Sequence, residues 1–323
     1  MAKMSRLDVG EDLQPHISMR YDPSARVTLF HGDCLELLKD LPSGTVQLVV
    51  TSPPYNLGKP YERKRLSLEE YVEQQARVIA ECVRVLGPKG SICWEVGNYV
   101  EGNRIIPLDI ALFSIFEKHG LVLRNRIVWH FEHGLHCSQR FSGRYETILW
   151  FTKSEDYLFD LDAVRVPQKY PGKKYYKGPK KGEYSSHPLG KNPGDVWLLP
   201  NVKHNHPEKT IHPCQFPVEL VERLILAFTN ESDLVLDPFI GVGTTAVAAI
   251  LHNRRAAGAD VVGDYLRIAE ERIRLASMGA LKTRPMERPI YQPPTGNRGT
   301  KSRGNPGGLR RIDEDVLLAQ QKD

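Results

Sequence analysis

A hydroxyl and an aromatic ring flank two prolines at Ser52-Pro53-Pro54-Tyr55, directly after the apolar run Val46 to Val50. The apolar run predicts a short buried strand. Neither proline can donate a hydrogen bond to a neighbouring strand, so the chain should leave the sheet as a stiff, extended loop. Such a loop offers the Ser52 hydroxyl and a backbone carbonyl to an amino group, and the Tyr55 ring to a planar heterocycle. A proline-stiffened loop in which Tyr55 only packs is the alternative that this stretch leaves open.

A loop with two glycines, Asp237 to Thr245, follows the apolar run Leu234 to Leu236. Gly241 and Gly243 let the backbone approach a ligand closely, and the N-terminus of the helix predicted from Thr244 suits a carboxylate or another anion. The loop lacks the third glycine of the dinucleotide fingerprint and the Gly-Lys-Ser/Thr of a triphosphate-binding loop. The pattern therefore disfavours NAD and ATP as ligands.

Two acids stand at or just beyond the ends of predicted strands. Asp260 closes the strand Arg255 to Asp260, and a carboxylate there can accept hydrogen bonds from both hydroxyls of a ribose. Asp33 follows the strand Arg26 to His31 and precedes a helix, so by itself it is an ordinary N-cap. The position of Asp260 therefore predicts a ligand that carries a ribose.

Strands and helices alternate along most of the chain, which predicts βαβ units and a mostly parallel sheet. Ser67 to Glu70 has the pattern of a capping box at a helix start, and Gly87 to Gly90 has that of a turn. Strands are expected at 26–31, 46–50, 91–96, 121–131, 146–152, 234–237 and 255–260, and helices at 34–41, 67–86, 107–119, 218–228, 244–251 and 263–278.

The two loops together resemble those of the amino-methylating DNA methyltransferases. In that family the catalytic loop reads Ser/Asp/Asn-Pro-Pro-Tyr/Phe and the cofactor loop reads Asp-Pro-Phe-x-Gly-x-Gly-Thr. The catalytic loop comes first here, which is the order of the β group, and the resemblance covers most of residues 26–278. It implies an α/β fold with a doubly wound, mostly parallel sheet of the seven-stranded, Rossmann-like type, with circularly permuted motifs.

The resemblance implies S-adenosylmethionine as cofactor, S-adenosylhomocysteine as product, and no metal. In the family, the Gly-Asp before the catalytic loop lies by the cofactor adenine, and a His-Pro-x-Gln-x-Pro segment lies beside its methionine part. Many members have Lys where this chain has Phe216, so a backbone N–H or a hydroxyl such as that of Thr210 must serve the cofactor carboxylate. The expected cofactor-binding residues are Asp33, Thr51, His212, Pro213, Asp237, Pro238, Phe239, Gly241, Gly243, Thr244 and Asp260.

The resemblance also implies the reaction. The target base is flipped out of the DNA duplex, because its amino group cannot otherwise reach the cofactor methyl. Ser52 and the Pro53 carbonyl orient the amine, Tyr55 stacks on the base, and the nitrogen attacks in line without a covalent enzyme intermediate. A carbon-5 cytosine methyltransferase would need a Pro-Cys nucleophile, and none stands at a suitable place. The expected catalytic residues are Ser52, Pro53, Pro54 and Tyr55.

The modified base is the open point. Ser at the first motif position resembles the enzymes that make N4-methylcytosine, whereas Asp or Asn is usual for N6-methyladenine. Hydroxyl and carboxylate are both acceptors, so chemistry alone does not decide. We favour a cytosine-N4-specific enzyme, with adenine-N6 as the alternative. An RNA or protein methyltransferase and a DNA-binding protein without catalysis are lower alternatives, the last because both motifs are intact.

Residues 165–210 interleave lysines with tyrosines and contain few acids. A solvated basic loop is the plain interpretation, but in the β group this slot holds the target-recognition region, with lysines on phosphates. The basic stretch after the catalytic loop is expected to lie over the active site. The expected DNA-binding residues are Lys59, Arg63, Lys64, Arg65, Lys173, Lys174, Tyr175, Tyr176, Lys177, Lys180 and Lys181.

These features predict five parts: a flexible arm (1–25), the catalytic half of the methyltransferase domain (26–164), a basic target-recognition insert (165–210), the cofactor-binding half (211–279) and a flexible basic tail (280–323). The expected partners are double-stranded DNA, a restriction endonuclease on a separate chain, and a second copy in a homodimer, with no membrane.

The composition is that of a soluble globular protein, with 323 residues, 41% hydrophobic and 26% charged. No apolar run is long enough to span a membrane, and the first twenty residues lack the apolar core of a signal peptide. We therefore expect a cytoplasmic, nucleoid-associated protein of a bacterium, archaeon or phage. Five scattered cysteines predict neither disulfides nor a zinc site, and His204, His206 and His212 lack further ligands at a recognisable spacing.

Overall fold

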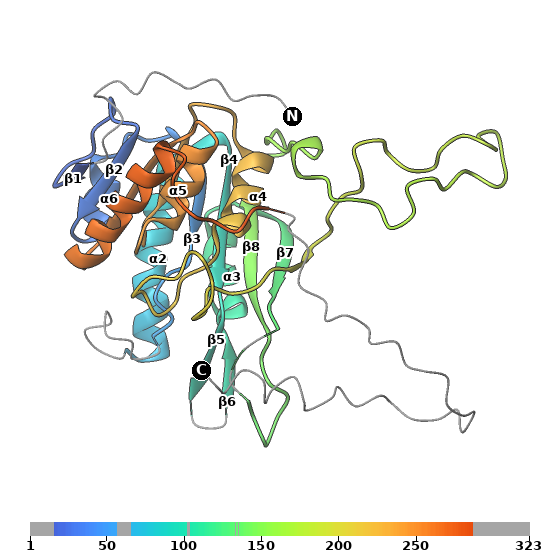
Figure 1. Ribbon diagram of the computed structural model, residues 1–323. Helices are drawn as coiled ribbons and strands as arrows, with labels where there is room; N and C mark the ends of the chain where they lie inside the picture. The colour runs from blue at the N-terminus through green and yellow to red at the C-terminus, as the bar shows by residue number, and fades with distance from the viewer. Residues whose placement is uncertain (1–15, 57–65, 102–103, 133, 135, 287–323) are drawn as a thin grey trace. The chain divides into compact units, whose positions relative to one another are not determined.

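A nine-stranded, mostly parallel sheet organises the computed structural model, which describes residues 16–56, 66–101, 104–132, 134 and 136–286 (Figure 1). Of these strands, β8 alone runs antiparallel to its neighbours. The predicted doubly wound fold is confirmed, and the short edge strands β1 and β9 extend the expected seven. In spatial order the strands are β1 (His16–Ser18), β2 (Val27–His31), β11 (Arg255–Asp260), β10 (Leu234–Asp237), β3 (Val46–Thr51), β4 (Leu86–Val96), β8 (Tyr145–Thr152), β7 (Val122–His130) and β9 (Val196–Leu198).

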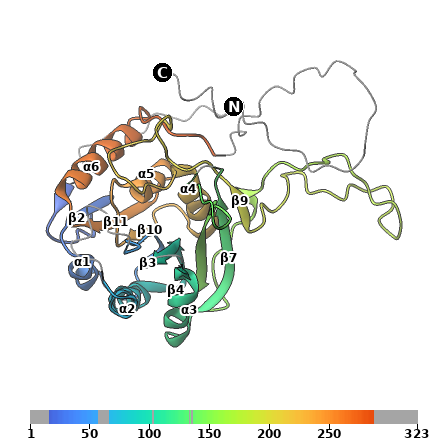
Figure 2. The ribbon, with the colours of Figure 1, turned by 90° about the horizontal axis from the view of Figure 1, so that it is seen from below.

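Helices cover both faces of this sheet, as Figure 2 shows. One face packs against α1 (Cys34–Asp40), α2 (Leu68–Val85) and α3 (Leu108–Lys118). The other packs against α4 (Val218–Phe228), α5 (Thr244–Leu251) and α6 (Gly263–Ser277). No helix in the described part of the chain is long and apolar enough to cross a membrane.

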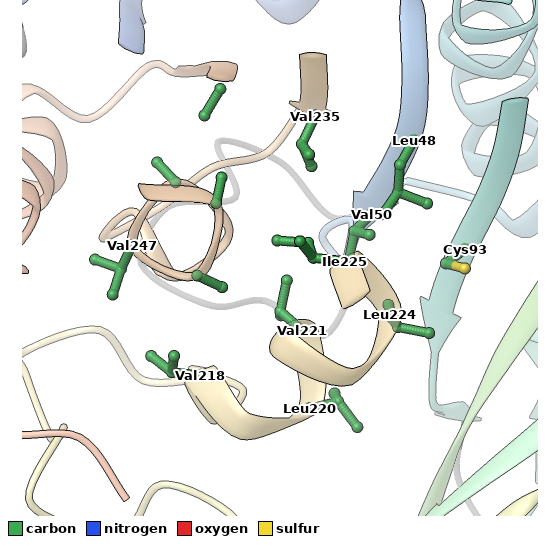
Figure 3. Close-up of a cluster of buried hydrophobic side chains, with 14 of the residues drawn as sticks. Leu48, Val50, Cys93, Val218, Leu220, Val221, Leu224, Ile225, Val235 and Val247 are labelled. Carbon is green, nitrogen blue, oxygen red and sulfur yellow. The ribbon is translucent and has the colours of Figure 1, made fainter. Parts of the chain in front are cut away.

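The central strand β3 shows why the chain folds this way. Successive side chains of a strand point to opposite faces, so Leu48 and Val50 pack with α4 while Val49 packs with α1 and α2. Figure 3 shows Leu48 and Val50 beside Ile225 of α4. A strand with both faces covered is mostly apolar, which explains why Gln47 is the one polar residue between Val46 and Val50.

The predicted element bounds hold closely, with three differences. The turn predicted at Gly87 to Gly90 is wrong, because these residues lie inside β4 as a bulge between the pairs Val46–Leu86 and Leu48–Ser91. The hairpin of β5 (Asn98–Glu101) and β6 (Arg104–Pro107) and the strand β9 were not predicted. The capping box is confirmed: Ser67 accepts from the Glu70 N–H at 3.1 Å, and Glu70 accepts from the Ser67 N–H at 2.8 Å.

The basic insert folds back on itself as a long arm. The bridges Val166–Lys191 and Lys174–Tyr184 pair its two limbs. Both ribbon views show the arm extending away from the sheet beyond β9 (Figures 1 and 2). Residues 196–198, within the predicted insert, return to the sheet as β9. The arm therefore starts and ends at a fixed place on the sheet edge.

Buried charges join the segment after α6 to the start of α4. The Arg284 guanidinium contacts both carboxylate oxygens of Glu219, which is fully buried. Glu208 accepts from the Arg284 N–H at 3.0 Å and from the Val218 N–H at 2.9 Å. Burial raises the pKa of Glu219 to about 7, although Arg284 acts in the opposite direction. The chain beyond α6 is thus held in place by an ion pair that solvent does not screen.

Removing this cation should destabilise the protein. Arg284→Ala leaves Glu219 without its partner, and breaking a buried pair costs about 3–5 kcal/mol. Arg274→Ala is the matched control, because Arg274 pairs with Glu271 on the exposed side of α6 and such pairs contribute about 0–1 kcal/mol. Urea unfolding of both variants measures the difference. Equal losses of unfolding free energy would contradict this role of Arg284.

Candidate active site

Four neighbouring strands end at one cavity. The strands β2, β11, β10 and β3 are adjacent and parallel, so their carboxyl ends lie at the same edge of the sheet. A cavity of about 690 Å³ opens at this edge. It joins the serine-proline loop, which follows Thr51, to the glycine loop, which starts at Asp237, 186 positions further along the chain. The predicted residues that line it are Asp33, Ser52, Pro53, Pro54, Tyr55, His212, Phe239, Gly241, Thr244 and Asp260.

The other predicted cofactor residues, Thr51, Pro213, Asp237, Pro238 and Gly243, do not line the cavity. Asp237 is buried and accepts hydrogen bonds from the hydroxyls of Thr51 and Thr245, both at 2.6 Å. Burial raises the pKa of Asp237 to about 6, and these hydrogen bonds hold it below what burial alone would give. The hydrogen bond between Thr51 and Asp237 therefore joins the start of the serine-proline loop to the start of the glycine loop, outside the cavity lining.

Gly241 and Gly243 both have positive φ, at 49° and 77°. A Cβ on Gly243 would lie 2.7 Å from the Ala269 Cβ, so only glycine lets α6 pack this close. A Cβ on Gly241 would lie 3.3 Å from Nε2 of His212, whose ring packs against Tyr265 at 4.7 Å between centroids. Burial lowers the pKa of His212 to about 4, so its imidazole is neutral at neutral pH.

The two strand-end acids, Asp260 and Asp33, line the same cavity. Asp260 accepts from the Gly241 N–H at 3.1 Å and from the Val262 N–H at 2.7 Å, one on each carboxylate oxygen. Each oxygen keeps a lone pair for a ligand hydroxyl. Asp33 caps α1 by accepting from the Leu35 N–H at 2.8 Å, so it is both an N-cap and a cavity residue.

Tyr55 anchors the serine-proline loop. Its hydroxyl donates to Oε2 of Glu95 at 2.6 Å and lies 3.0 Å from the Ser52 hydroxyl. Burial, together with the carboxyl groups of Glu146 and Glu95, raises the pKa of Tyr55 well above its usual value, so the phenol keeps its proton. The Tyr55 ring itself is 9% exposed and lines the cavity.

Asn56 is held to Leu66 by its side chain. Its φ is +59°, and its side chain both donates to the Leu66 carbonyl and accepts from the Leu66 N–H at 2.7 Å. These two bonds bring positions 56 and 66 together. The predicted DNA-binding residues Lys59, Arg63, Lys64 and Arg65 lie outside the described residues.

Glu95 and Glu146 are site residues that the sequence analysis missed. Burial and the neighbouring Glu95 raise the pKa of Glu146 well above its usual value. The available signal was an acid inside an apolar run, at Glu95 in Ser91 to Val96. Its pairing with Tyr55 could not be read from the sequence, because it depends on which strands are neighbours.

The predicted hydroxyl of Thr210 is already engaged within its own loop. It donates to Oε1 of Gln215 at 2.8 Å and accepts from the His212 N–H at 3.2 Å. Phe216 lines the cavity. The described residues hold no group of three or more His, Cys, Asp and Glu side chains placed to bind a metal ion.

The predicted DNA-binding residues of the insert lie on the arm and away from the cavity lining. Their side chains are exposed, and Lys174 lies 5.0 Å from the centroid of the Tyr184 ring. The residues are Lys173, Lys174, Tyr175, Tyr176, Lys177, Lys180 and Lys181.

Comparisons with known proteins agree with this geometry. The chain is 53% identical over 263 residues to the Type II methyltransferase M.BglII of Bacillus subtilis, covering 81% of this chain and 73% of the relative. It is 32% identical over 295 residues to the DNA adenine methyltransferase YhdJ of Escherichia coli K12, covering 90% and 94%.

A solved structure and a family model match as well. The crystal structure of TTHA0409 from Thermus thermophilus, complexed with S-adenosyl-L-methionine, superposes with a TM-score of 0.56 at 29% identity and covers 78% of this chain and 94% of that one. The N6/N4 DNA methylase family model matches residues 46–271, from the start of β3 into α6. The chain therefore belongs to the N6/N4 family of DNA methylases and is a DNA methyltransferase.

Proposed function

We propose that the protein transfers a methyl group from S-adenosylmethionine to the exocyclic N4 nitrogen of a flipped-out cytosine in duplex DNA. The observation that carries the proposal is the single cavity into which the serine-proline loop and the glycine loop both open. An in-line transfer needs its two reactants side by side, and orientation of this kind contributes much of the rate enhancement in such reactions.

The cavity suits the cofactor at its glycine-loop side. Asp260 offers two acceptors for the ribose hydroxyls, and Asp33 lies at the neighbouring strand end for the adenine. Gly241 lets the backbone approach closely, and α5 presents its N-terminus. When bound, the cofactor supplies an electrophilic methyl on its sulfonium. The neutral His212 adds no positive charge beside that group.

The hydrogen bonds around Tyr55 make Ser52 an acceptor. A phenol has one proton, and that of Tyr55 goes to Glu95 at 2.6 Å. The contact between Ser52 and Tyr55 must then have Ser52 as its donor. The Ser52 lone pairs are left to accept from the target NH₂, which turns the nitrogen lone pair toward the methyl. The same chain, from Ser52 through Tyr55 to Glu95, offers a route for the proton that the methylated nitrogen loses.

Cytosine is proposed because Ser52 resembles the first motif residue of enzymes that make N4-methylcytosine. N6-methyladenine is the second candidate product, and one comparison favours it: the Escherichia coli relative is named a DNA adenine methyltransferase. Two hydrogen bonds link Ser52 through Tyr55 to the carboxyl group of Glu95. The neutral serine is therefore connected to an acid, although the first motif position itself carries none.

The proposed partners follow from the relatives and the arm. The Type II relative supports protection of host DNA against a restriction endonuclease on a separate chain. The exposed lysines and tyrosines of the arm suit duplex DNA, with the lysines on phosphates. The protein would act in the cytoplasm, alone or as a homodimer.

Nucleoside analysis after methyl transfer tests the function. Labelled S-adenosylmethionine is incubated with mixed genomic DNA, RNA or protein, and DNA is digested to nucleosides. We expect label in DNA, on the N4 nitrogen of cytosine, and a rate about 100-fold lower for Ser52→Ala because one oriented acceptor is lost. Label on N6 of adenine would replace the proposed base and keep the mechanism. Label only in RNA or protein, or none at all, would overturn the proposal.

The arm's contact with phosphates should appear in the salt dependence of DNA binding. The double variant Lys177→Ala/Lys180→Ala should flatten the slope of log K against log salt by up to about 0.9 for each lost phosphate contact. Lys39→Ala/Lys118→Ala, on α1 and α3, is the charge-matched control. Fluorescence anisotropy with a labelled duplex measures both slopes. An arm variant with the slope of its control would contradict phosphate binding by the arm.

A further inference from the structure

The cavity has few groups that could balance an anion. Of the described residues that line it, Arg77 alone is a lysine or arginine. Arg77 lies on α2, which covers the face of the sheet opposite to that of α5. Phe216, which also lines the cavity, is apolar. A carboxylate bound near the start of α5 therefore needs its counter-charge from elsewhere.

Arg272 lies directly behind the glycine loop. It is on α6, is 5% exposed, and its Nη1 donates to the Val242 carbonyl at 2.6 Å and to the Thr244 hydroxyl at 3.1 Å. Val242 and Thr244 both line the cavity. The Thr244 side chain would thus lie between the guanidinium and a ligand in the cavity.

In the part of the chain that the structure describes, this cation has no direct ion-pair partner, and the buried Glu208 is the acid whose charge acts on it. No carboxylate lies within ion-pair distance of it there, and its Nη2 has no hydrogen-bond acceptor among those residues. Burial lowers the pKa of Arg272 to about 10, while the carboxyl group of Glu208 acts in the other direction, so the guanidinium is charged at neutral pH. A buried charge is costly unless it is paired, which points to an anion that arrives with a ligand.

The Thr244 hydroxyl connects the Arg272 guanidinium to the cavity. Its oxygen accepts from Arg272, and no acceptor for its own proton lies among the described residues. Its neighbour Thr245 differs, because that hydroxyl donates to Asp237. Gly243 caps α5 without a side-chain hydrogen bond, so no cap side chain satisfies the first N–H groups of the helix.

We propose that Arg272 is the cation that balances the amino-acid carboxylate of the cofactor, acting through the Thr244 hydroxyl and the N-terminus of α5. Arg272 is a positioning residue, because Thr244 and not Arg272 lines the cavity. The inference rests on the proposed use of S-adenosylmethionine. It assigns this chain a counter-charge on α6 rather than at position 216.

Comparing two ligands isolates the carboxylate. Calorimetry measures the affinity of the full-length protein for S-adenosylmethionine and for decarboxylated S-adenosylmethionine, which keeps the sulfonium, the amino group and the adenosine. In the wild type the carboxylate should strengthen binding by at least tenfold. The ratio of the affinity for S-adenosylmethionine to that for the decarboxylated ligand should fall close to one in Arg272→Gln, while the affinity for the decarboxylated ligand stays within about twofold of the wild type. Arg272→Lys should restore part of this ratio.

One further variant serves as a control, and another serves as a second test of the same contact. Arg274→Gln, on the exposed side of the same helix and paired with Glu271, is the control and should keep the wild-type ratio. Thr244→Val removes the hydroxyl without removing the buried cation, and should also reduce the ratio if Arg272→Gln does not fold. Equal weakening of both ligands, or an unchanged ratio in the folded variants, would overturn the role of Arg272. Failure of the wild type to bind either ligand would instead overturn the proposed cofactor.

Discussion

One buried carboxylate holds the two halves of the site together. Asp237 accepts a hydrogen bond from Thr51, the last residue of β3, and another from Thr245, in the first turn of α5. The next residue after Thr51 is the catalytic-loop serine, and the glycine loop starts at Asp237 itself. Because β3 and β10 are neighbours, this side chain fixes the distance between the loop that would hold the base and the loop that would hold the cofactor.

The polar groups around the cavity share a common arrangement. Two cavity hydroxyls and the starts of both loops are bonded to buried ionisable groups: Ser52 to Tyr55 and through it to Glu95, Thr244 to Arg272, and the loop starts to Asp237. Buried groups of this kind are held by short hydrogen bonds and are poorly screened by solvent. The site is therefore ordered before a ligand enters, which is the condition for catalysis by orientation and electrostatics.

Local signals in the sequence predicted much of the fold. The bounds of α4, α5 and β11 were read correctly, because Pro217, the glycine loop and Asp260 mark the ends of apolar runs. The turn at Gly87 to Gly90 was wrong, since glycine and proline there form a bulge inside a long strand. Strand β9 is only three residues long and joins the sheet by pairing with β7, which no local pattern encodes.

Residues of the sequence motifs were predicted, whereas residues whose place depends on the order of the strands were missed. Ten of the predicted residues line the cavity, whereas Glu95, Glu146 and Arg272 enter the site through contacts between distant segments. Thr51 and Asp237 were assigned to the cofactor from the motif, and the structure has them bonded to each other beneath it. Sequence spacing identifies such residues but cannot say which of them touch.

Single-turnover methyl transfer by Thr51→Val tests the central role of Asp237 most directly. Thr51 does not line the cavity, so valine, which has nearly the same shape, removes only its hydrogen bond to the buried carboxylate. The account predicts a rate at saturating cofactor at least tenfold below the wild type, because small displacements of the reacting groups are costly. Thr45→Val, which removes a hydrogen bond to the Pro42 carbonyl just before β3, should keep the wild-type rate. An unchanged rate in a folded Thr51→Val protein would contradict the account.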